Sequence, residues 1–486
     1  MRPINGICIA SAIMVTALAA CKHKAPEVYA PSSGSYPEAV SAVFVNKCAM
    51  AGCHNEASHD NAGGLLLDSW DHLFDGGNNG AVIVPYSTDY SPLLYFINTD
   101  STLGPVALPT MPLNHPPLSR KEYLTIRNWV AEGAPDKDGN IPFADNAAQR
   151  QKIYFIHQVC DILGVVDAEK NVVMRYIPVG EKPYPEALIH TRASKDGRYV
   201  YTCFWYSNKI HKIDAATDRI VATFTLGNSF WTNMEISDDG EKLALINYDN
   251  FDLAIVNTIT GQATYYNNTN MIRPMSLAAN SSFDTFYVTS QFGNTLYKFT
   301  NTIVKTISID GNTLTQTSGV GPDPYSITMS PDRSKYFIAC ERTNEVRVFN
   351  SSNDALIKVL NAGANPRNIT MTTGKPYVFI TCMEDANVPA LSKGSVYIFN
   401  YNTLEMVKRI DGKLYQPHSV AVNEKDNTFY VFSRNQNYDG PAPHHQGPCS
   451  GRNGFYTVYD LNTFQPVNDR RYEVLVDPYV SDIRFK

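Results

Sequence analysis

The stretch PYSITMSPDRSKYFIACERTNEVRVFN, residues 324–350, decides how the larger part of this chain folds. Two runs rich in β-branched and aromatic residues flank a Ser-Pro-Asp turn, and a third run follows, which is the pattern of consecutive β-strands. Related stretches are PRNITMTTGKPYVFITC at residues 366–382, PHSVAVNEKDNTFYVFS at 417–433 and a further copy at 275–300. The recurrence predicts a repeated unit of strands.

The first residue of each repeat recurs at a regular spacing. These opening positions are Leu188, Trp231, Pro274, Pro324, Pro366, Pro417 and Pro478, and they lie 43, 43, 50, 42, 51 and 61 residues apart. This is the length of a four-stranded propeller blade, so seven positions predict seven blades. Residues 478–486 supply a single strand, and residues 162–180 match the last two strands of a blade. We expect the two to share one blade, which would leave no open sheet edge.

The repeat also predicts which side chains face the central funnel. They are the residues that follow the opening positions, namely Ile189, Thr232, Met275, Tyr325, Arg367, His418 and Tyr479. Three cysteines that share one later repeat position, Cys203, Cys340 and Cys382, are expected to be packing residues, because other blades have Asn or Ser there.

The sixth blade carries an insertion, NYDGPAPHHQGPCSGRNG, at residues 437–454. It is expected to place His444, His445 and Cys449 on the funnel face near His418. These four side chains could bind copper or zinc, or hold a substrate together with Arg367 and Arg434. The alternative is a loop over the funnel whose histidines are hydrogen-bonded or solvated and whose cysteine is free or paired.

Length and composition limit the classes of protein that fit. A chain of 486 residues predicts at least two domains, and 43% hydrophobic residues with 18% charged residues exclude disorder and coiled coil. The net charge of -6 makes nucleic acid an unsuitable partner. Residues 35–150 contain six Lys or Arg and thirteen Asp or Glu, which predicts a docking partner with a basic face.

The chain begins with MRPINGICIASAIMVTALAAC, an apolar segment too short to span a bilayer and typical of a secretory signal. Its ending, Leu18-Ala19-Ala20-Cys21, resembles the lipobox of bacterial lipoproteins, which implies a lipid on Cys21. An ordinary cleaved signal is the alternative. The lipobox places the protein outside the cytoplasm, anchored to the bacterial outer membrane and facing the periplasm or the cell surface. Loss of Cys8 and lipidation of Cys21 leave seven cysteines, so at least one stays outside any internal disulfide.

Cys48-Ala49-Met50-Ala51-Gly52-Cys53-His54 brings two thiols and an imidazole together. A His directly after the second Cys is the arrangement that a covalently attached haem requires. Four residues separate the cysteines here, whereas two are usual, and a local disulfide between Cys48 and Cys53 is the alternative. The motif predicts one haem c, with His54 as the proximal iron ligand.

The segment that follows, with NAGGLLLDSWDHLFDGGNNGAVIVP and LPTMPLNHPPLSRKEYLTIRNWVAEGAP, resembles the cytochrome c domains of large bacterial extracytoplasmic proteins over residues 38–136. The resemblance implies a closing helix at residues 119–134 and Met111 as the distal iron ligand. His115 is the main alternative ligand, and His59 and His72 are weaker ones. Simple packing is the other interpretation of Met111.

The segment YVTSQFGNTLYKF, residues 287–299, resembles the propellers named for a Tyr-Val-Thr-Asn repeat. The expected organisation is a signal peptide at 1–20, a tether at 21–37, a small all-α cytochrome c domain at 38–140, a linker at 141–151 and an all-β seven-bladed propeller at 152–486. This multidomain architecture implies fold more strongly than activity.

These features favour a membrane-anchored c-type cytochrome that transfers electrons and uses the propeller to dock a partner or substrate. Two alternatives stay open. One is an oxidoreductase with a second redox centre, such as copper, in the funnel. The other is a binding lipoprotein without catalysis. An electron carrier is favoured over an enzyme, and an enzyme of this kind would be an oxidoreductase. The expected partners are a redox protein with a basic docking face and the lipid bilayer that holds the Cys21 anchor. The sequence does not specify the oligomeric state.

Overall fold

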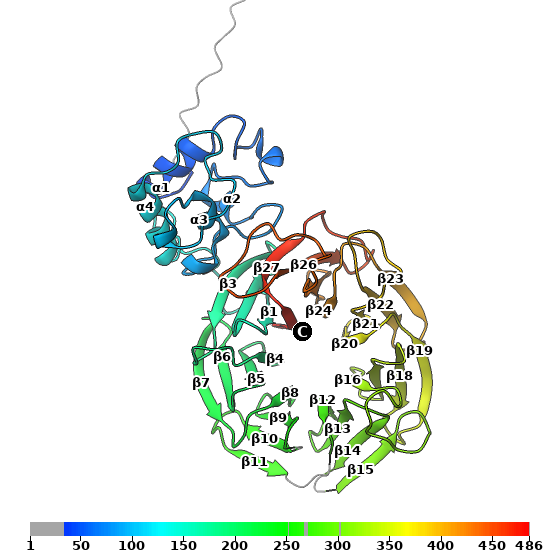
Figure 1. Ribbon diagram of the computed structural model, residues 1–486. Coiled ribbons are helices and arrows are strands. Elements are labelled where there is room, and N and C mark those ends of the chain that lie inside the picture. The colour runs from blue at the N-terminus through cyan, green and yellow to red at the C-terminus, as the bar shows by residue number, and fades with distance from the viewer. Residues whose placement is uncertain (1–33, 251, 267–270, 301–302, 486) are drawn as a thin grey trace, which may run out of the picture.

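The computed structural model describes residues 34–250, 252–266, 271–300 and 303–485. The expected signal peptide, the lipidation site Cys21 and most of the tether lie outside the described residues. Two parts of the chain are visible in Figure 1: a small helical domain and a ring of β-sheets beside it. Among the described residues, no helix combines the length and apolar character needed to cross a bilayer.

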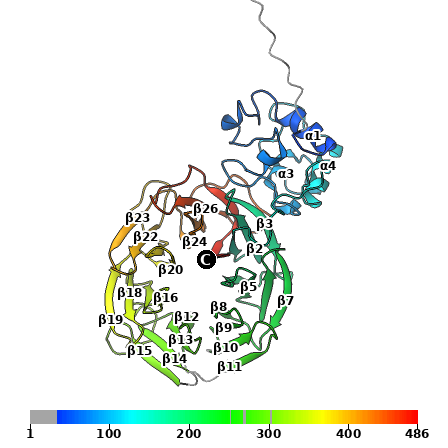
Figure 2. The same ribbon diagram turned by 180° about the vertical axis from the view of Figure 1, so that it is seen from behind.

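The ring consists of seven four-stranded antiparallel sheets, which confirms the predicted seven-bladed propeller (Figures 1 and 2). The closing blade contains β28 (Pro478–Ile483), β1 (Lys152–His157), β2 (Ile162–Asp167) and β3 (Val172–Pro178). The next two blades contain β4 (Leu188–Ala193), β5 (Tyr199–Phe204), β6 (Lys209–Asp214), β7 (Arg219–Thr225), and β8 (Trp231–Ile236), β9 (Lys242–Asn247), β10 (Leu253–Asn257), β11 (Ala263–Tyr266). Two more contain β12 (Pro274–Ala279), β13 (Thr285–Ser290), β14 (Thr295–Thr300), β15 (Ile303–Ser308), and β16 (Pro324–Met329), β17 (Lys335–Cys340), β18 (Glu345–Asn350), β19 (Leu356–Asn361). The last two contain β20 (Pro366–Met371), β21 (Tyr377–Cys382), β22 (Ser395–Asn400), β23 (Met406–Ile410), and β24 (Pro417–Asn423), β25 (Thr428–Ser433), β26 (Asn453–Asp460), β27 (Tyr472–Val476).

Every predicted opening position is the first residue of an innermost strand. Proline suits this place because the first residue of a strand can forgo its ladder hydrogen bond. In all seven blades the register of the innermost strand shifts directly after the opening residue, as between Pro324 and Ser326. A bulge re-aims the side chains around it, and the seven residues predicted to face the funnel all line the central cavity.

The closing blade joins two distant parts of the chain. β28 pairs with β1 in antiparallel register, with Ile153 opposite Ile483 and Tyr154 opposite Asp482. Directly after β28, the guanidinium of Arg484 donates to the carbonyl oxygens of Ala147 at 2.7 Å and Gly197 at 2.7 Å. The segment that leads out of the helical domain is therefore bound to the same blade that closes the ring.

The three cysteines are packing residues, as predicted, but only two of them share a repeat position. Cys340 and Cys382 pair with the opening residues of their blades, whereas Leu188 pairs with Phe204, so Cys203 lies one residue before that position. Cys203 in β5, Cys340 in β17 and Cys382 in β21 are each fully buried, and none of the three is in a disulfide. Burial raises the pKa of all three thiols, because a thiolate would lose its hydration in the core. They are therefore poor candidates for redox or metal chemistry.

The helical domain consists of short helices around one aromatic core. Its elements are α1 (Glu38–Val43), the π-helix η1 (Phe44–Cys48), η2 (His59–Asn61), α2 (Trp70–Leu73), η3 (Thr88–Tyr90), α3 (Pro92–Ile97), η4 (Ser101–Leu103) and α4 (Arg120–Ala131).

The helix α4 is the closing helix that the sequence predicts. Ser119 and Glu122 form a reciprocal capping box at its start. Its buried face contains Tyr123, Ile126, Trp129 and Val130, whereas Leu124 is only partly buried.

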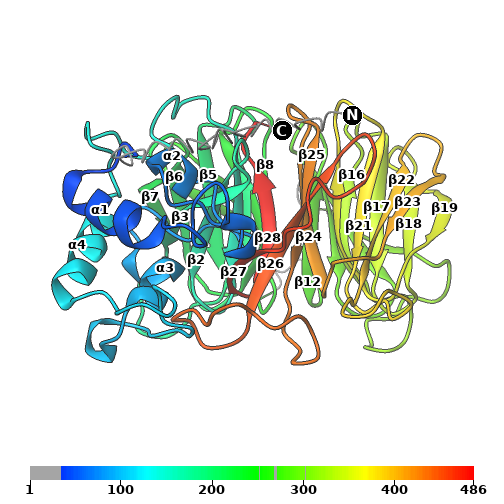
Figure 3. The same ribbon diagram turned by 90° about the horizontal axis from the view of Figure 1, so that it is seen from above.

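The helical domain packs directly against the closing blade and its neighbour (Figure 3). The ring of Tyr90 lies edge-on to that of Tyr176 in β3, with centroids 5.5 Å apart. Lys170, in the β2–β3 turn, forms an ion pair with Asp75 of the helical domain. The backbone amide of Glu473 in β27 donates to Asn79 at 2.9 Å.

A buried ion pair connects the closing blade to the next one. The ammonium of Lys152 in β1 lies 2.7 Å from the carboxylate of Asp218 in the β6–β7 turn, and both side chains are almost fully buried. The hydroxyl of Tyr154 donates to the same carboxylate at 2.9 Å. Loss of one partner would leave the other charge buried without compensation.

Substitution Asp218→Asn should therefore lower the free energy of unfolding by about 3–5 kcal/mol, because the charge of Lys152 loses its partner. Urea unfolding followed by circular dichroism measures this change. The matched control is Glu405→Gln, whose ion pair with Lys358 is largely exposed. It should change the unfolding free energy by less than about 1 kcal/mol. Equal effects of the two substitutions would contradict the importance of the buried pair.

Candidate functional site

The Cys48–His54 segment forms a compact turn at the end of η1. Cys48 is buried and ends the helix, whereas Cys53 and His54 are partly exposed. The amide of His54 donates to the carbonyl of Cys48 at 3.1 Å, and that of Cys53 donates to Met50 at 3.0 Å. Both cysteines have free thiols, so the disulfide that the sequence left open as an alternative is absent from this part of the described chain.

The ring of His54 is oriented by the backbone. Its Nδ1 lies 3.1 Å from the carbonyl oxygen of Leu65, and because a carbonyl only accepts, Nδ1 carries the proton. Burial lowers the pKa of His54, and the bond to Leu65 partly offsets this effect. The neutral ring therefore has its lone pair on Nε2, where no hydrogen-bond partner is found among the described residues. A metal-ligating histidine has this tautomer, with its other ring nitrogen held by a carbonyl, as Leu65 does here.

Met111 lies in a loop that is bonded to α3. Its amide donates to the carbonyl of Phe96 at 2.8 Å, and the amide of Ala107 donates to that of Tyr95 at 2.9 Å. The peptide bonds before Pro109 and Pro112 are both cis. The thioether side chain is partly buried against the core of the domain.

The same loop exposes large apolar side chains. Leu108 is 79% exposed, Leu113 51% and Val106 45%. An exposed apolar cluster of this kind indicates a surface that another apolar body covers. A porphyrin is such a body, so the unpaired thiols, the oriented imidazole and this apolar loop all fit a covalently bound haem.

The alternative histidine ligands differ in their surroundings. His115 is exposed on the Met111 loop. The ring of His72 lies 2.7 Å from the carboxylate of Asp68, and that of His59 lies 3.1 Å from the carbonyl of Glu56. No group of three or more His, Cys, Asp or Glu side chains in the described part of the chain could hold a metal ion.

Residues 51–105 match the family model described as Planctomycete cytochrome C. The N-terminal domain is thus cytochrome c-like, and a domain of this kind implies haem c. The matched range contains Cys53 and His54, while Cys48 and Met111 lie just outside it. No curated protein matches the chain.

One solved structure to which part of this chain is similar is described as that of a functionally unknown protein from Desulfotomaculum acetoxidans DSM 771. It shares 13% sequence identity, and the similarity covers 67% of this chain and 99% of that chain, with a TM-score of 0.49. No functional inference follows from it.

The insertion of the sixth blade contacts the cytochrome c-like domain. The ring of His444 lies 4.9 Å from that of Phe96, and the ring of His445 lies 5.6 Å from that of Tyr95. Both aromatic partners belong to α3. The prediction that these histidines face the funnel beside His418 is therefore wrong, because the insertion packs against the neighbouring domain instead.

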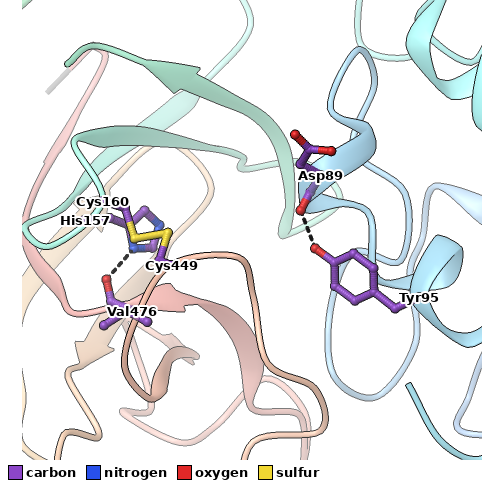
Figure 4. The surroundings of a disulfide bond; sticks show 6 residues. All are labelled: Asp89, Tyr95, His157, Cys160, Cys449 and Val476. Atoms are coloured by element: carbon purple, nitrogen blue, oxygen red, sulfur yellow. Dashed lines mark hydrogen bonds between the residues drawn. A yellow bond between two sulfur atoms is a disulfide. The ribbon is translucent and has the colours of Figure 1, made fainter. Parts of the chain in front are cut away.

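Cys449 is also not available as a metal ligand, because it forms a disulfide with Cys160 in the β1–β2 turn (Figure 4). The bond fixes the insertion to the closing blade across 289 residues of sequence. The predicted grouping of His418, His444, His445 and Cys449 does not occur.

Glu473 is a site residue that the sequence analysis missed. Its buried carboxylate accepts from the amide of His444 at 2.7 Å and from Asn453 at 2.7 Å, and lies 3.2 Å from Nδ1 of His445. Burial raises the pKa of Glu473. Its backbone amide bonds to Asn79, so one residue links the insertion, the propeller and the cytochrome c-like domain.

His157 lies next to the disulfide at the end of β1 (Figure 4). The side chain is fully buried, and Nδ1 is 3.1 Å from the carbonyl oxygen of Val476. Burial lowers the pKa of His157 to about 3, because the imidazolium would lose its hydration. The folded state therefore binds this proton more weakly than the unfolded state does.

The stability contributed by neutral His157 should be present above the unfolded pKa of about 6.5 and be lost as the pH falls towards 3. Between pH 7 and pH 5 the loss amounts to about 2 kcal/mol. In the variant His157→Gln this part of the pH dependence should disappear, whereas the exposed control His72→Gln should follow the unsubstituted protein. Urea unfolding at both pH values provides the measurement. An unchanged slope in His157→Gln would contradict the prediction.

Proposed function

We propose that this protein is a lipid-anchored, extracytoplasmic c-type cytochrome that transfers single electrons, with the propeller as a docking or substrate-binding platform. The observation that carries the proposal is the oriented, neutral imidazole of His54 directly after two free thiols in a cytochrome c-like domain. The anchor rests on the sequence ending at Cys21.

When bound, haem c supplies a one-electron iron couple. Cys48 and Cys53 would hold it through thioether bonds to its vinyl groups. His54 would supply Nε2 to the iron, with the ring oriented by the carbonyl of Leu65. Met111 would supply a soft thioether, a ligand that favours the ferrous state and raises the reduction potential. His115 is the alternative distal ligand, and it would give a lower potential.

The acidic character of the domain suits a basic redox partner. Residues 35–150 carry thirteen acidic and six basic side chains. Attraction between opposite charges raises the association rate, and salt weakens it. The electron donor and acceptor are thus sought among proteins with a positively charged docking face.

Mass spectrometry of the tryptic peptide that contains Cys48, Cys53 and His54 tests the centre of the proposal. Protein produced with haem maturation and export should be coloured, and the peptide should carry one haem. The double variant Cys48→Ser/Cys53→Ser should lose the covalent haem. Cys340→Ser is the matched control, because Ser290 and Ser433 pair with the opening residues of their blades as Cys340 does. An unmodified dithiol in colourless protein would overturn the proposal.

The substitution Met111→His tests the distal ligand. Exchange of a thioether for an imidazole should lower the midpoint potential by on the order of 100 mV, within the ~0.8 V range that axial ligands span. It should also remove the absorption band of methionine-ligated ferric haem. His115→Ala should leave both properties unchanged. If His115→Ala shifts the potential and Met111→His does not, His115 is the ligand.

A further inference from the structure

The central funnel of the propeller is crossed by a pair of tyrosines. The hydroxyl oxygens of Tyr325 in β16 and Tyr479 in β28 are 2.7 Å apart. These strands belong to blades that are not neighbours, because β20 and β24 lie between them on one side and β4, β8 and β12 on the other. The hydrogen bond therefore spans the funnel.

Two arginine side chains lie against this tyrosine pair. The guanidinium of Arg367 lies 4.2 Å from the ring centroid of Tyr325, and that of Arg434 lies 4.8 Å from the ring centroid of Tyr479. Each arginine also has one carboxylate partner, Glu341 for Arg367 and Asp477 for Arg434. Of these four charged residues, only Arg367 lines the cavity.

His418 also lies against this pair, and its ring stacks on Tyr479 with centroids 3.8 Å apart. Nδ1 donates to the carbonyl oxygen of Tyr479 at 2.5 Å. Burial, followed by the charges of Arg434 and Arg367, holds the pKa of His418 well below its usual value. The ring is therefore neutral, and Nε2 is a hydrogen-bond acceptor.

Several polar atoms of this cavity lack partners. The buried atoms without a hydrogen bond among the described residues include Nε2 of His418, Nε of Arg367, Oγ1 of Thr232, Oδ1 of Asn233 and Oγ of Ser326. All five residues line one cavity of about 290 Å³ and come from four blades. A buried polar group without a partner is destabilising, so five such groups in the lining of one cavity are typical of a ligand site.

The chemistry of these groups defines the ligand. Arg367 requires an acceptor, preferably an anionic one. His418 and Asn233 require donors, which a hydroxyl supplies, while Thr232 and Ser326 can donate or accept. From these observations we propose that the funnel binds a small organic hydroxycarboxylate, with its carboxylate at Arg367 and a hydroxyl at His418. This site is separate from the electron-transfer proposal and stands or falls independently of it.

Isothermal titration calorimetry on the full chain tests the site with five probes: lactate, gluconate, propionate, lactamide and inorganic phosphate. At least one hydroxycarboxylate should bind about tenfold or more tightly than propionate, which lacks the hydroxyl, and than lactamide, which lacks the charge. Phosphate should bind no better than propionate. Absence of binding by both hydroxycarboxylates at millimolar concentration would overturn the proposal, as would equal binding of lactamide or tighter binding of phosphate.

Variants locate the binding site. Arg367→Gln should weaken hydroxycarboxylate binding about tenfold or more, Arg367→Lys should weaken it less, and His418→Gln should reduce the preference over propionate. Arg342→Gln is the matched control, because Arg342 is exposed outside the funnel and pairs with Asp323. Circular dichroism checks that each variant is folded. Unchanged affinity in Arg367→Gln would overturn the assignment, as would a crystal structure of the gluconate complex with the ligand elsewhere.

Discussion

The pairing of β28 with β1 is the constraint on which the remaining structure depends. Each propeller sheet buries its faces against its neighbours, so the ring is stable only when the last strand meets the first blade. That same blade carries Lys152, whose charge is balanced by Asp218 in the next blade. It also carries His157, which lies next to the disulfide that joins this blade to the insertion of the sixth blade. It also supports the helical domain through β3. Closure therefore fixes the funnel and the position of the cytochrome c-like domain together.

The sequence predicts the propeller in detail because the same pattern of strands and turns recurs in every blade. Seven opening positions, each at a strand start, also identified the seven side chains of the funnel, since the bulge after the opening residue recurs from blade to blade. The insertion after β25 has no counterpart in other blades, so its direction could not be read from the period. Its destination depends on a surface of α3 and on Cys160, which are far away in sequence. The predicted cluster around His418 failed for this reason.

For the cytochrome c-like domain, the sequence identified the candidate residues but not their environments. Cys48, Cys53 and His54 are recognisable by spacing alone. The carbonyl of Leu65 that orients His54, and the exposure of Leu108 and Leu113 beside Met111, follow only from how the loops fold. Glu473 gave no sequence signal, because its role arises from three segments that meet at one carboxylate. Roles that depend on tertiary contacts cannot be predicted from local sequence patterns.

The short helix α3 has neighbours on two sides, and this has a consequence for redox kinetics. Its backbone carbonyls hold the Met111 loop, while the rings of Tyr95 and Phe96 are packed against His445 and His444 of the insertion. Under the proposed ligand assignment, an iron coordinated by Met111 would change oxidation state while the ligand loop is held in place by these contacts. Little nuclear rearrangement would then accompany each electron, and a small reorganisation energy permits rapid exchange with a partner at modest driving force.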